Sequence, residues 1–350
     1  MKKRAGKARK VILTAVVSVL VIIVALAVTA GIVLHDRIAT VSSLKSVGNL
    51  RTLNYQQDYY LDKALSSQID SDKKLFKFIS DNLLFGYQLK GSSDEYACSA
   101  FTTESENGQY LVGRNFDAPD AMDAISVYTH PENGYASIAT TADVLLGIGE
   151  VYKIPGDSFW GKATLLAAPY FCVDGVNEKG LSVSALNLDM EETHEDNGKP
   201  DLLLTVAIRL LLDRAATVDE AVELLGQYDY HSHHGWTQHL YIADASGKSA
   251  AVEWRKGKMK TAESRVCTNF ELTSQSSVKK PTGNCDRFDI LYDSLKAKPK
   301  NSTEDAFRLL KSVNQEITEW SVVYNLTEFT ADYAVDSDYK NTIHLSPKDY

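Results

Sequence analysis

Apolar residues recur with the period of a helix in the part of the chain that precedes residue 98. Leu61, Leu65 and Ile69 are spaced four apart, and a second stripe of apolar residues at spacings of three and four follows over 75–83. Such spacings place apolar side chains on one face of an α-helix. The pattern therefore predicts a helical segment over 35–97.

Beyond residue 98, short apolar and β-branched stretches alternate with turn residues, which is typical of strands and hairpins. Turns are expected at Asn177–Gly180 and at Asp244–Gly247, where glycine ends a polar stretch. The strands predicted in this way are 98–103, 110–115, 125–130, 135–140, 150–154, a pair within 168–188, a hairpin within 238–263, 265–270 and a C-terminal group within 321–335.

Helices are expected between these groups of strands. Pro200 is tolerated in a first helical turn and predicts a helix that reaches about Leu212. Thr217 and Glu220 have the spacing of a capping box and predict a second helix directly afterwards. Further helical patterns cover 286–295 and 303–313. Runs of hairpins interrupted by pairs of helices predict an α+β fold, with two sheets packed face to face and helices outside.

The N-terminus has a different composition from the rest of the chain. Residues 1–10 hold six Lys or Arg and no acid, and residues 11–34 carry no charge in 24 positions. About 20 apolar residues can span a bilayer. The sequence thus predicts a basic cytoplasmic tail, 1–10, and a transmembrane signal anchor, 11–34, that places the remainder outside the cytoplasm. A signal peptide cleaved after this stretch is the alternative.

The remaining charge excludes one class of function. Without the first ten residues, 31 basic residues face 46 acidic ones, a net charge of −15. Nucleic-acid-binding proteins need a basic surface, so no nucleic-acid partner is expected.

Candidate chemistry centres on Cys98, which directly precedes a predicted hairpin whose return strand ends in Arg114-Asn-Phe-Asp117. An arginine near a thiol favours the thiolate. The two charged residues are three apart, so an extended strand would place them on opposite faces unless it bends. The other cysteines are Cys172, Cys267 and Cys285. They are expected to be small buried hydrophobes, with a Cys267–Cys285 disulfide left open.

A reactive thiol also needs a base, and the sequence offers two. One is a histidine of the segment 231–239, which contains His231, His233, His234 and His239. That cluster lacks a clear zinc-ligand spacing, and it is expected to be a solvated loop. The other is the α-amine of Cys98 itself, which exists only if the chain is cut before this residue. An α-amine with a pKa near 8 is a usable base at neutral pH.

Five segments together resemble the choloylglycine hydrolase family, which includes bile salt hydrolases and penicillin V acylases. They are CSAF through GRNFD (98–117), DGVNEKGLSVSALNL (174–188), HLYIADASGKSAAVEW (239–254), VCTNFEL (266–272) and CDRFDIL (285–291). The resemblance covers about 98–345. It implies an N-terminal-nucleophile hydrolase domain, 98–350, with an αββα four-layer sandwich and no metal or organic cofactor. The small-molecule substrate would be an acyl amide, and homo-oligomers are left open.

The resemblance also implies a role for each of six residues. Cys98 is the nucleophile, Asp117 orients its amine, and Arg114 and Arg287 tune the thiolate and the site. Asn187, through its backbone N–H, and Asn269, through its side-chain amide, hold the oxyanion. Two such donors together stabilise a developing oxyanion by several kcal/mol, about 2.7–4 kcal/mol each.

The chain departs from the simplest members of the family, because 97 residues precede the cysteine. We expect autocleavage between Ala97 and Cys98, with 35–97 retained as a small subunit or pro-segment. The function expected is hydrolysis of linear non-peptide C–N bonds. Alternatives are acyl transfer through the same thioester and an inactive surface-anchored binding protein. The substrate is left open among bile salts, penicillin V, acyl homoserine lactones and fatty-acid amides.

Overall fold

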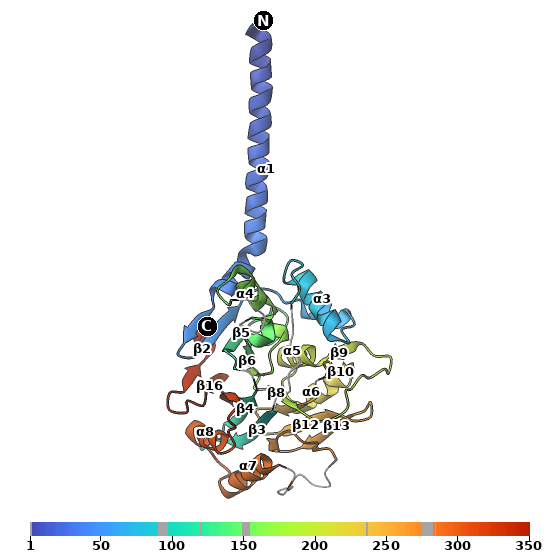
Figure 1. The fold of residues 1–350 in the computed structure, drawn as a ribbon, viewed down its shortest axis with the longest axis vertical. Coiled ribbons are helices and arrows are strands. Elements are labelled where there is room, and N and C mark those ends of the chain that lie inside the picture. Colours follow the sequence, from blue (N-terminus) through green and yellow to red (C-terminus); the bar gives the residue numbers. More distant parts are fainter. Residues whose placement is uncertain are drawn as a thin grey trace.

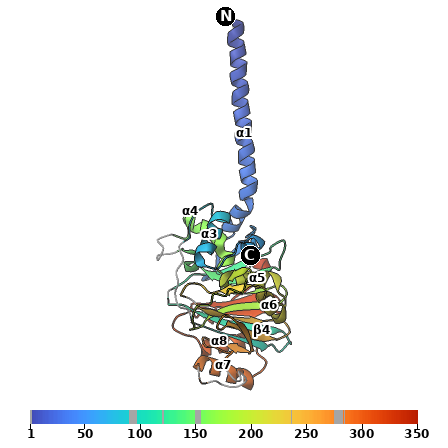
Figure 2. The same cartoon turned by 90° about the vertical axis from the view of Figure 1, so that its right-hand side faces the viewer.

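The structure, a computed structural model, describes residues 2–89, 97–119, 121–148, 155–235, 237–274, 283 and 285–350. Its long N-terminal helix α1 (Lys2–Ser42) extends away from a body of strands and shorter helices (Figures 1 and 2). The last turns of α1 are attached to the body. Arg37 Nη2 donates to the carbonyl oxygen of Asn82 at 2.9 Å, and Thr40 is fully buried.

Among the residues that the structure describes, none of the helices combines the length and apolarity that a membrane span requires. The transmembrane anchor predicted for 11–34 therefore gains no support here. Several side chains of that stretch lie outside the described residues.

A nine-stranded sheet forms the larger half of the body, in the order β1-β2-β5-β6-β7-β8-β11-β12-β13. All its neighbouring strands are antiparallel except β2 and β5, which are parallel. Its strands are β1 (Lys45–Val47), β2 (Leu50–Tyr55), β5 (Ala124–Thr129), β6 (Ser137–Ala142), β7 (Asp174–Asn177), β8 (Ser182–Asn187), β11 (Gln238–Ala243), β12 (Ser249–Trp254) and β13 (Met259–Glu263).

A six-stranded antiparallel sheet faces it, in the order β14-β3-β4-β15-β16-β17. Its strands are β14 (Val266–Cys267), β3 (Ala97–Glu104), β4 (Tyr110–Asp117), β15 (Thr318–Asn325), β16 (Thr330–Val335) and β17 (Ile343–Leu345). A small parallel pair, β9 (Asp201–Leu203) and β10 (Asp229–His231), lies apart from both sheets.

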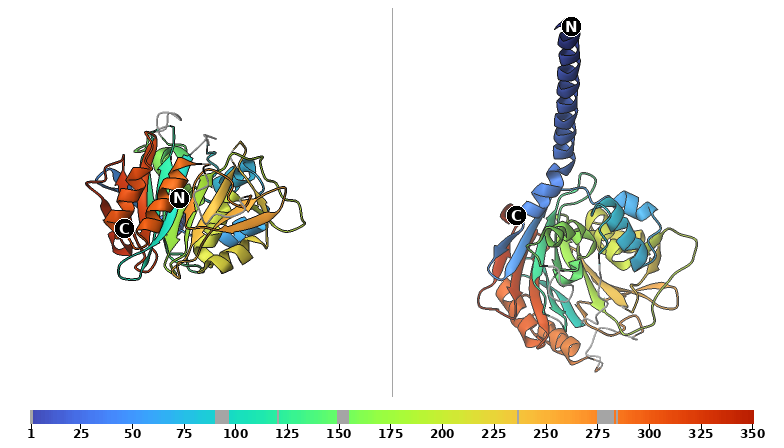
Figure 3. Two further views of the ribbon diagram at one scale, coloured as in Figure 1. Left: turned by 90° about the horizontal axis from the view of Figure 1, so that it is seen from below. Right: turned by 45° about the horizontal axis from the view of Figure 1, so that its top comes forward.

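Helices cover the outer faces of the two sheets, so the body has four layers (Figures 1 and 3). The inner faces meet through polar as well as apolar contacts, such as the hydroxyls of Thr102 and Tyr241 at 2.7 Å. The helices of the body are α2 (Leu61–Ser66), α3 (Asp72–Asn82), α4 (Phe159–Thr164), α5 (Leu204–Arg214), α6 (Val218–Leu225), α7 (Asp286–Ala297) and α8 (Thr303–Ser312), with 3-10 turns at Val144–Leu146, Leu165–Tyr170 and Pro347–Asp349.

Two apolar cores hold these layers together. One joins α5 and α6 to the nine-stranded sheet, and the other lies between the two sheets and beneath α7 and α8. Buried polar contacts support the second core, since Asn115 Nδ2 donates to the carbonyl oxygen of Leu310 at 2.9 Å. The predicted α+β arrangement of two sheets with outer helices is thus the observed one.

The prediction of an all-helical segment over 35–97 agrees with the structure at its start, where α1 extends to Ser42, and is wrong over 45–55. Residues 45–47 and 50–55 are strands, and Gly48 has a φ of +61° in the turn between them. Strand β2 pairs with β5, and Leu50 and Leu53 are fully buried. Tertiary pairing of this kind overrides weak local helical preference. Helices α2 and α3 confirm the prediction for 61–66 and 72–82, whereas Ile69 lies outside α2 and forms a bridge with Leu202, and 90–96 lie outside the described residues.

Most later predictions agree with the structure within a few residues. The helix expected from Pro200 begins only at Leu204, because 201–203 form β9. Thr217 caps α6 as predicted, its side chain accepting the N–H of Glu220. The strand expected at 150–154 lies outside the described residues.

Candidate active site

Cys98 lies near the start of β3, beside the end of β4. The register pairs Cys98 with Phe116 and Ala100 with Arg114. Because side chains alternate along strands, the thiol and the guanidinium share one face, and Arg114 Nη2 is 3.6 Å from Cys98 Sγ. Asp117 is on the opposite face, as a separation of three residues requires. It nevertheless borders the site because it pairs directly with Ala97.

Arg114 is fully buried and connects the two sheets at the thiol. Its Nη2 donates to the carbonyl oxygen of Ala185 at 2.7 Å, and its Nε is 3.0 Å from Asp174 Oδ2. Both partners belong to the facing sheet, on β8 and β7. Burial raises the pKa of the Cys98 thiol above its ordinary value, while the charge of Arg114 opposes this rise. The arginine is therefore placed to stabilise the thiolate.

Asp117 is fully buried but accepts several hydrogen bonds. Gln315 Nε2 donates to it at 2.5 Å, Thr318 Oγ1 at 2.6 Å, and Arg287 Nη1 at 3.2 Å. Burial raises the pKa of this carboxyl group, whereas the hydrogen bonds and the arginine lower it. The sequence analysis missed Gln315 and Thr318. No motif marks them, since they reach Asp117 only through the pairing of β15 with β4.

The backbone of Cys98 is held from the other side by Asn269 and Arg287. Asn269 Oδ1 accepts the N–H of Cys98 at 2.8 Å and an N–H of Arg287 Nη2 at 2.7 Å. Arg287 Nη1 donates to the carbonyl oxygen of Cys98 at 2.8 Å. Asn269 Nδ2 donates to the carbonyl oxygen of Asn187 at 2.7 Å. The structure therefore brings all six predicted site residues into one connected network.

This arrangement combines what acyl transfer to sulfur needs. A cation lies beside the thiol, the amide oxygen of Asn269 accepts the backbone N–H of Cys98, and a carboxylate lies across from the preceding residue. Cys98 is only 1% exposed, however, in a chain that continues through Ala97. The thiol of the uncut chain is thus shielded from solvent.

The prediction that the histidine-rich segment is a solvated loop is wrong. His231, His233 and His239 are 6%, 8% and 0% exposed. Each has a carboxylate partner that compensates its burial: His231 contacts Asp201, His233 contacts Asp72, and His239 contacts Glu253. The side chain of His234 is 90% exposed, as expected. These partners come from distant segments, which the local sequence could not indicate.

The other cysteines are free. Cys172 and Cys267 are buried as expected, whereas Cys285 is partly exposed, and Cys267 and Cys285 form no disulfide.

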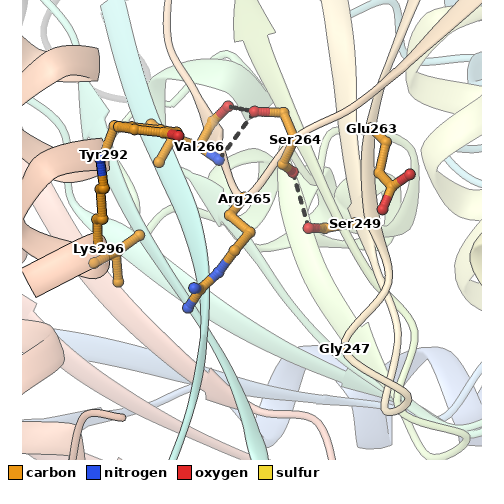
Figure 4. A pocket seen from close by; sticks show the side chains of 9 residues that line it. Gly247, Ser249, Glu263, Ser264, Arg265, Val266, Tyr292 and Lys296 are labelled. Carbon is orange, nitrogen blue, oxygen red and sulfur yellow. Dashed lines mark hydrogen bonds between the residues drawn. The ribbon is translucent and has the colours of Figure 1, made fainter. Parts of the chain in front are cut away.

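A cavity of about 440 Å³ lies beside α7 and shares no residue with this network. Figure 4 shows part of its lining, which includes Arg265, Tyr292 and Lys296, and the hydrogen bond in which the Ser249 hydroxyl donates to the backbone carbonyl oxygen of Ser264 at 2.8 Å. The hydroxyl of Ser264 donates in turn to the carbonyl oxygen of Val266 at 2.7 Å, so both serines of the lining are hydrogen-bonded to the backbone.

Comparison with known proteins identifies the family. The family of linear amide C–N hydrolases called the choloylglycine hydrolase family matches residues 98–279, a match that begins at the cysteine singled out by the sequence. The penicillin V acylase of Pectobacterium atrosepticum is 28% identical over 199 residues, which is 53% of this chain and 51% of that protein. The bile salt hydrolase/transferase of Clostridium perfringens is 26% identical over 184 residues, 48% of this chain and 51% of that protein.

Solved structures show the same fold. A mutant of the conjugated bile acid hydrolase of Clostridium perfringens has a TM-score of 0.53 at 17% identity, covering 72% of this chain and 93% of that one. The penicillin V acylase of Agrobacterium tumefaciens has a TM-score of 0.52 at 21% identity, covering 72% of this chain and 86% of that one. The chain spans about half the length of the curated relatives it matches. The family match covers more than half of the chain, which therefore belongs to the choloylglycine hydrolase family of linear amide C–N hydrolases.

Proposed function

We propose that this protein hydrolyses the linear C–N bond of acyl amides, with Cys98 as an N-terminal nucleophile freed by cleavage of the Ala97–Cys98 bond. The observation that carries the proposal is the convergence on Cys98 of a buried cation at its thiol and of Asn269 at its backbone nitrogen. The carboxylate of Asp117 lies across from Ala97.

Cleavage would begin with attack of the Cys98 sulfur on the carbonyl carbon of Ala97. The peptide C–N bond breaks as a thioester forms, and the thiol proton passes to the departing nitrogen. Water then hydrolyses the thioester, which leaves a carboxylate on Ala97 and a free thiol and α-amine on Cys98. Asn269 Oδ1, at 2.8 Å from that nitrogen, is in place to hold the new amine.

Turnover would use the same groups on an external amide. The α-amine takes the thiol proton, and the sulfur attacks the acyl carbonyl carbon. The Asn187 backbone N–H and the Asn269 amide stabilise the oxyanion. The ammonium returns the proton to the leaving amine, and water hydrolyses the thioester. Asp117 and Arg287 contact each other, and Arg287 also bonds to Asn269 and to the carbonyl oxygen of Cys98. These contacts hold the amine and the amide of Asn269 in position.

The upstream segment is expected to remain bound after cleavage. Strand β2 supplies Leu50 and Leu53 to the interior, and both are fully buried. Fully burying a leucine side chain contributes about 1.5–3 kcal/mol. Release of 1–97 would expose these residues and the edge of β5, so a two-chain form is favoured over a shed pro-segment.

Mass spectrometry of purified protein tests the cleavage, which predicts two fragments, one beginning at Cys98, that co-elute under native conditions. A panel of penicillin V, bile salts, acyl homoserine lactones and fatty-acid amides tests the activity against the Cys98→Ala variant. An intact chain with full activity would refute the N-terminal nucleophile. No turnover of any amide, with no labelling of Cys98 by an electrophilic acyl probe, would favour an inactive binding protein.

One relative is named as a transferase as well as a hydrolase, which keeps acyl transfer as a second candidate. Addition of hydroxylamine separates the two, because a thioester that a nucleophile intercepts yields a hydroxamate in place of the acid. Placement of the body outside the cytoplasm rests on the sequence of 11–34 alone. Membrane fractionation and protease protection of whole cells test it.

A further inference from the structure

A buried chain of three side chains lies close to the residues that surround Cys98, and the proposed mechanism does not use it. His239 Nδ1 is 3.0 Å from Glu253 Oε1, and His239 Nε2 is 3.5 Å from Cys267 Sγ. All three residues are fully buried. They come from β11, β12 and β14, so the chain crosses from the nine-stranded sheet to the six-stranded sheet.

A cysteine, a histidine and a glutamate in this order have the residue types of a second catalytic triad. Burial raises the pKa of the Cys267 thiol well above its ordinary value, and the charge of Glu253 raises it further. No substrate atom can reach a sulfur that has no exposed surface. Cys267 therefore has a structural role here and is not a nucleophile. The functional contacts of the three residues are those that Glu253 makes at the opposite end.

That other end holds the loop that follows β14. Glu253 Oε1 accepts the N–H of Leu272 at 2.8 Å, and Oε2 accepts the N–H of Thr273 at 2.9 Å. The same loop carries Asn269, three residues before the first of these contacts. Cys267, at the far end of the chain, lies two residues before Asn269. The segment 267–273 is thus fixed at both ends by one hydrogen-bonded unit, with Asn269 between them.

The proton positions in this unit follow from its donors and acceptors. Glu253 meets two backbone N–H groups and one ring nitrogen, so the ring donates through Nδ1. In that tautomer, Nε2 accepts from the thiol of Cys267. Every donor then meets an acceptor, and the carboxylate carries the charge that three donors stabilise. Buried networks of this kind specify one geometry only when every member is satisfied.

We propose that Glu253 and His239 are positioning residues that set the amide of Asn269 against the Cys98 nitrogen and the oxyanion site. The inference rests on the proposed function for its kinetic consequences, because Asn269 is the group through which the effect reaches the reaction. The anchoring of 267–273 by Glu253 does not depend on which substrate the protein uses.

Glu253→Gln is the direct test, because the amide keeps an acceptor in place of Oε1 but presents an NH₂ group to the N–H of Thr273. We expect kcat to fall about tenfold to a hundredfold with little change in KM, somewhat less than removal of an oxyanion donor typically causes. The double variant Glu253→Gln/Asn269→Ala should be no slower than Asn269→Ala alone. If the loss of kcat in the double variant equals the product of the two single losses, Glu253 does not act through Asn269 and the inference is overturned.

Asp229→Asn is the matched control. Asp229 is a buried carboxylate that also accepts two backbone N–H groups, from Asn197 at 2.7 Å and Lys199 at 3.0 Å, and it lies on β10, outside the two sheets that carry the site network. We expect this variant to lose stability while keeping kcat. An equal loss of kcat in the control would show that any loosened carboxylate slows the enzyme, which would overturn the specific role.

Conservative replacement of His239 gives a second test. Asparagine can place an N–H near the position of Nδ1, whereas alanine cannot, so His239→Asn should retain more activity than His239→Ala. Equal loss in both variants would contradict the assigned donor.

Hydrogen exchange at Leu272 and Thr273 keeps the inference testable if no amide substrate is found. Glu253→Gln should accelerate exchange at these two amides by about tenfold or more, because a neutral amide is a weaker hydrogen-bond acceptor than a carboxylate. Unchanged exchange would overturn the anchoring even if the enzyme proves active. Faster exchange in a protein without amidase activity would instead refute only the proposed function.

Discussion

Replacing Arg114 by methionine separates what this side chain does for folding from what it does for the thiol. The substitution keeps an unbranched side chain about as long as the arginine stem to Nε and removes the charged guanidinium group. It leaves Asp174, which is fully buried, with the hydroxyl of Tyr324 at 2.5 Å and the indole N–H of Trp320 at 3.4 Å as its remaining partners. Breaking a buried ion pair from one side typically costs about 3–5 kcal/mol. Urea unfolding should show a loss of this size.

The double variant Arg114→Met/Asp174→Asn removes both charges. Buried ion pairs replaced on both sides are often neutral for stability, so the free energy of unfolding should return to within about 1–2 kcal/mol of the original. The reactivity of Cys98 should not return. At 3.6 Å and an effective dielectric constant near 20, a full charge would interact with the thiolate by about 4–5 kcal/mol. The guanidinium charge is delocalised and shared with Asp174, so we expect a smaller loss.

Labelling of Cys98 by an electrophilic acyl probe, located by peptide mass spectrometry, measures this loss. We expect the rate near neutral pH to fall about tenfold to a hundredfold in both variants, about 1.4–2.8 kcal/mol. The reasoning would be refuted if the double variant recovered stability and labelling together, since Arg114 would then serve the fold alone.

Three further predictions concern other parts of the molecule. Leu53→Ala should lower the free energy of unfolding by about 2–5 kcal/mol, because the side chain is fully buried; an unchanged urea midpoint would contradict the place of β2 in the core. Burial raises the pKa of the Cys98 thiol in the uncut chain, so its alkylation rate should still rise above pH 9; a plateau below pH 8 would argue against that burial. Hydrogen bonds from His239 and the loop lower the pKa of Glu253 below its ordinary 4.5, so its stabilising effect is fully present above pH 4.5 and is lost as the pH falls through the lowered value. Glu253→Gln should flatten that part of the stability profile, and an identical acid dependence in both proteins would count against it.

The sequence predicted the elements and site residues correctly where the information is local or carried by motifs. Apolar and β-branched stretches bounded by turn residues predicted β3 and β4, and the capping residue Thr217 predicted the start of α6. Five of the six residues carried over from the family resemblance lie in strands or helices, whereas Asn269 lies in the loop that follows β14. Cys98 and Arg114 face one another because the hairpin register places them on one face.

The missed features depend on contacts between distant segments. Strand β2 owes its conformation to pairing with β5, some seventy residues later, and this partner cannot be read from 50–55 alone. Asp174, Gln315 and Glu253 belong to the surroundings of the site for the same reason. A buried charge has to be matched by a partner, but the sequence does not say which of 46 acidic residues supplies it.

The position of β2 has a practical consequence for the preparation of the protein. A polypeptide that begins at Cys98, the natural choice for mimicking a processed product, would lack β1 and β2, two strands of the larger sheet, and would leave the edge of β5 unpaired. Such material should precipitate. Supplying the first 97 residues as a second polypeptide during refolding should rescue it by fragment complementation.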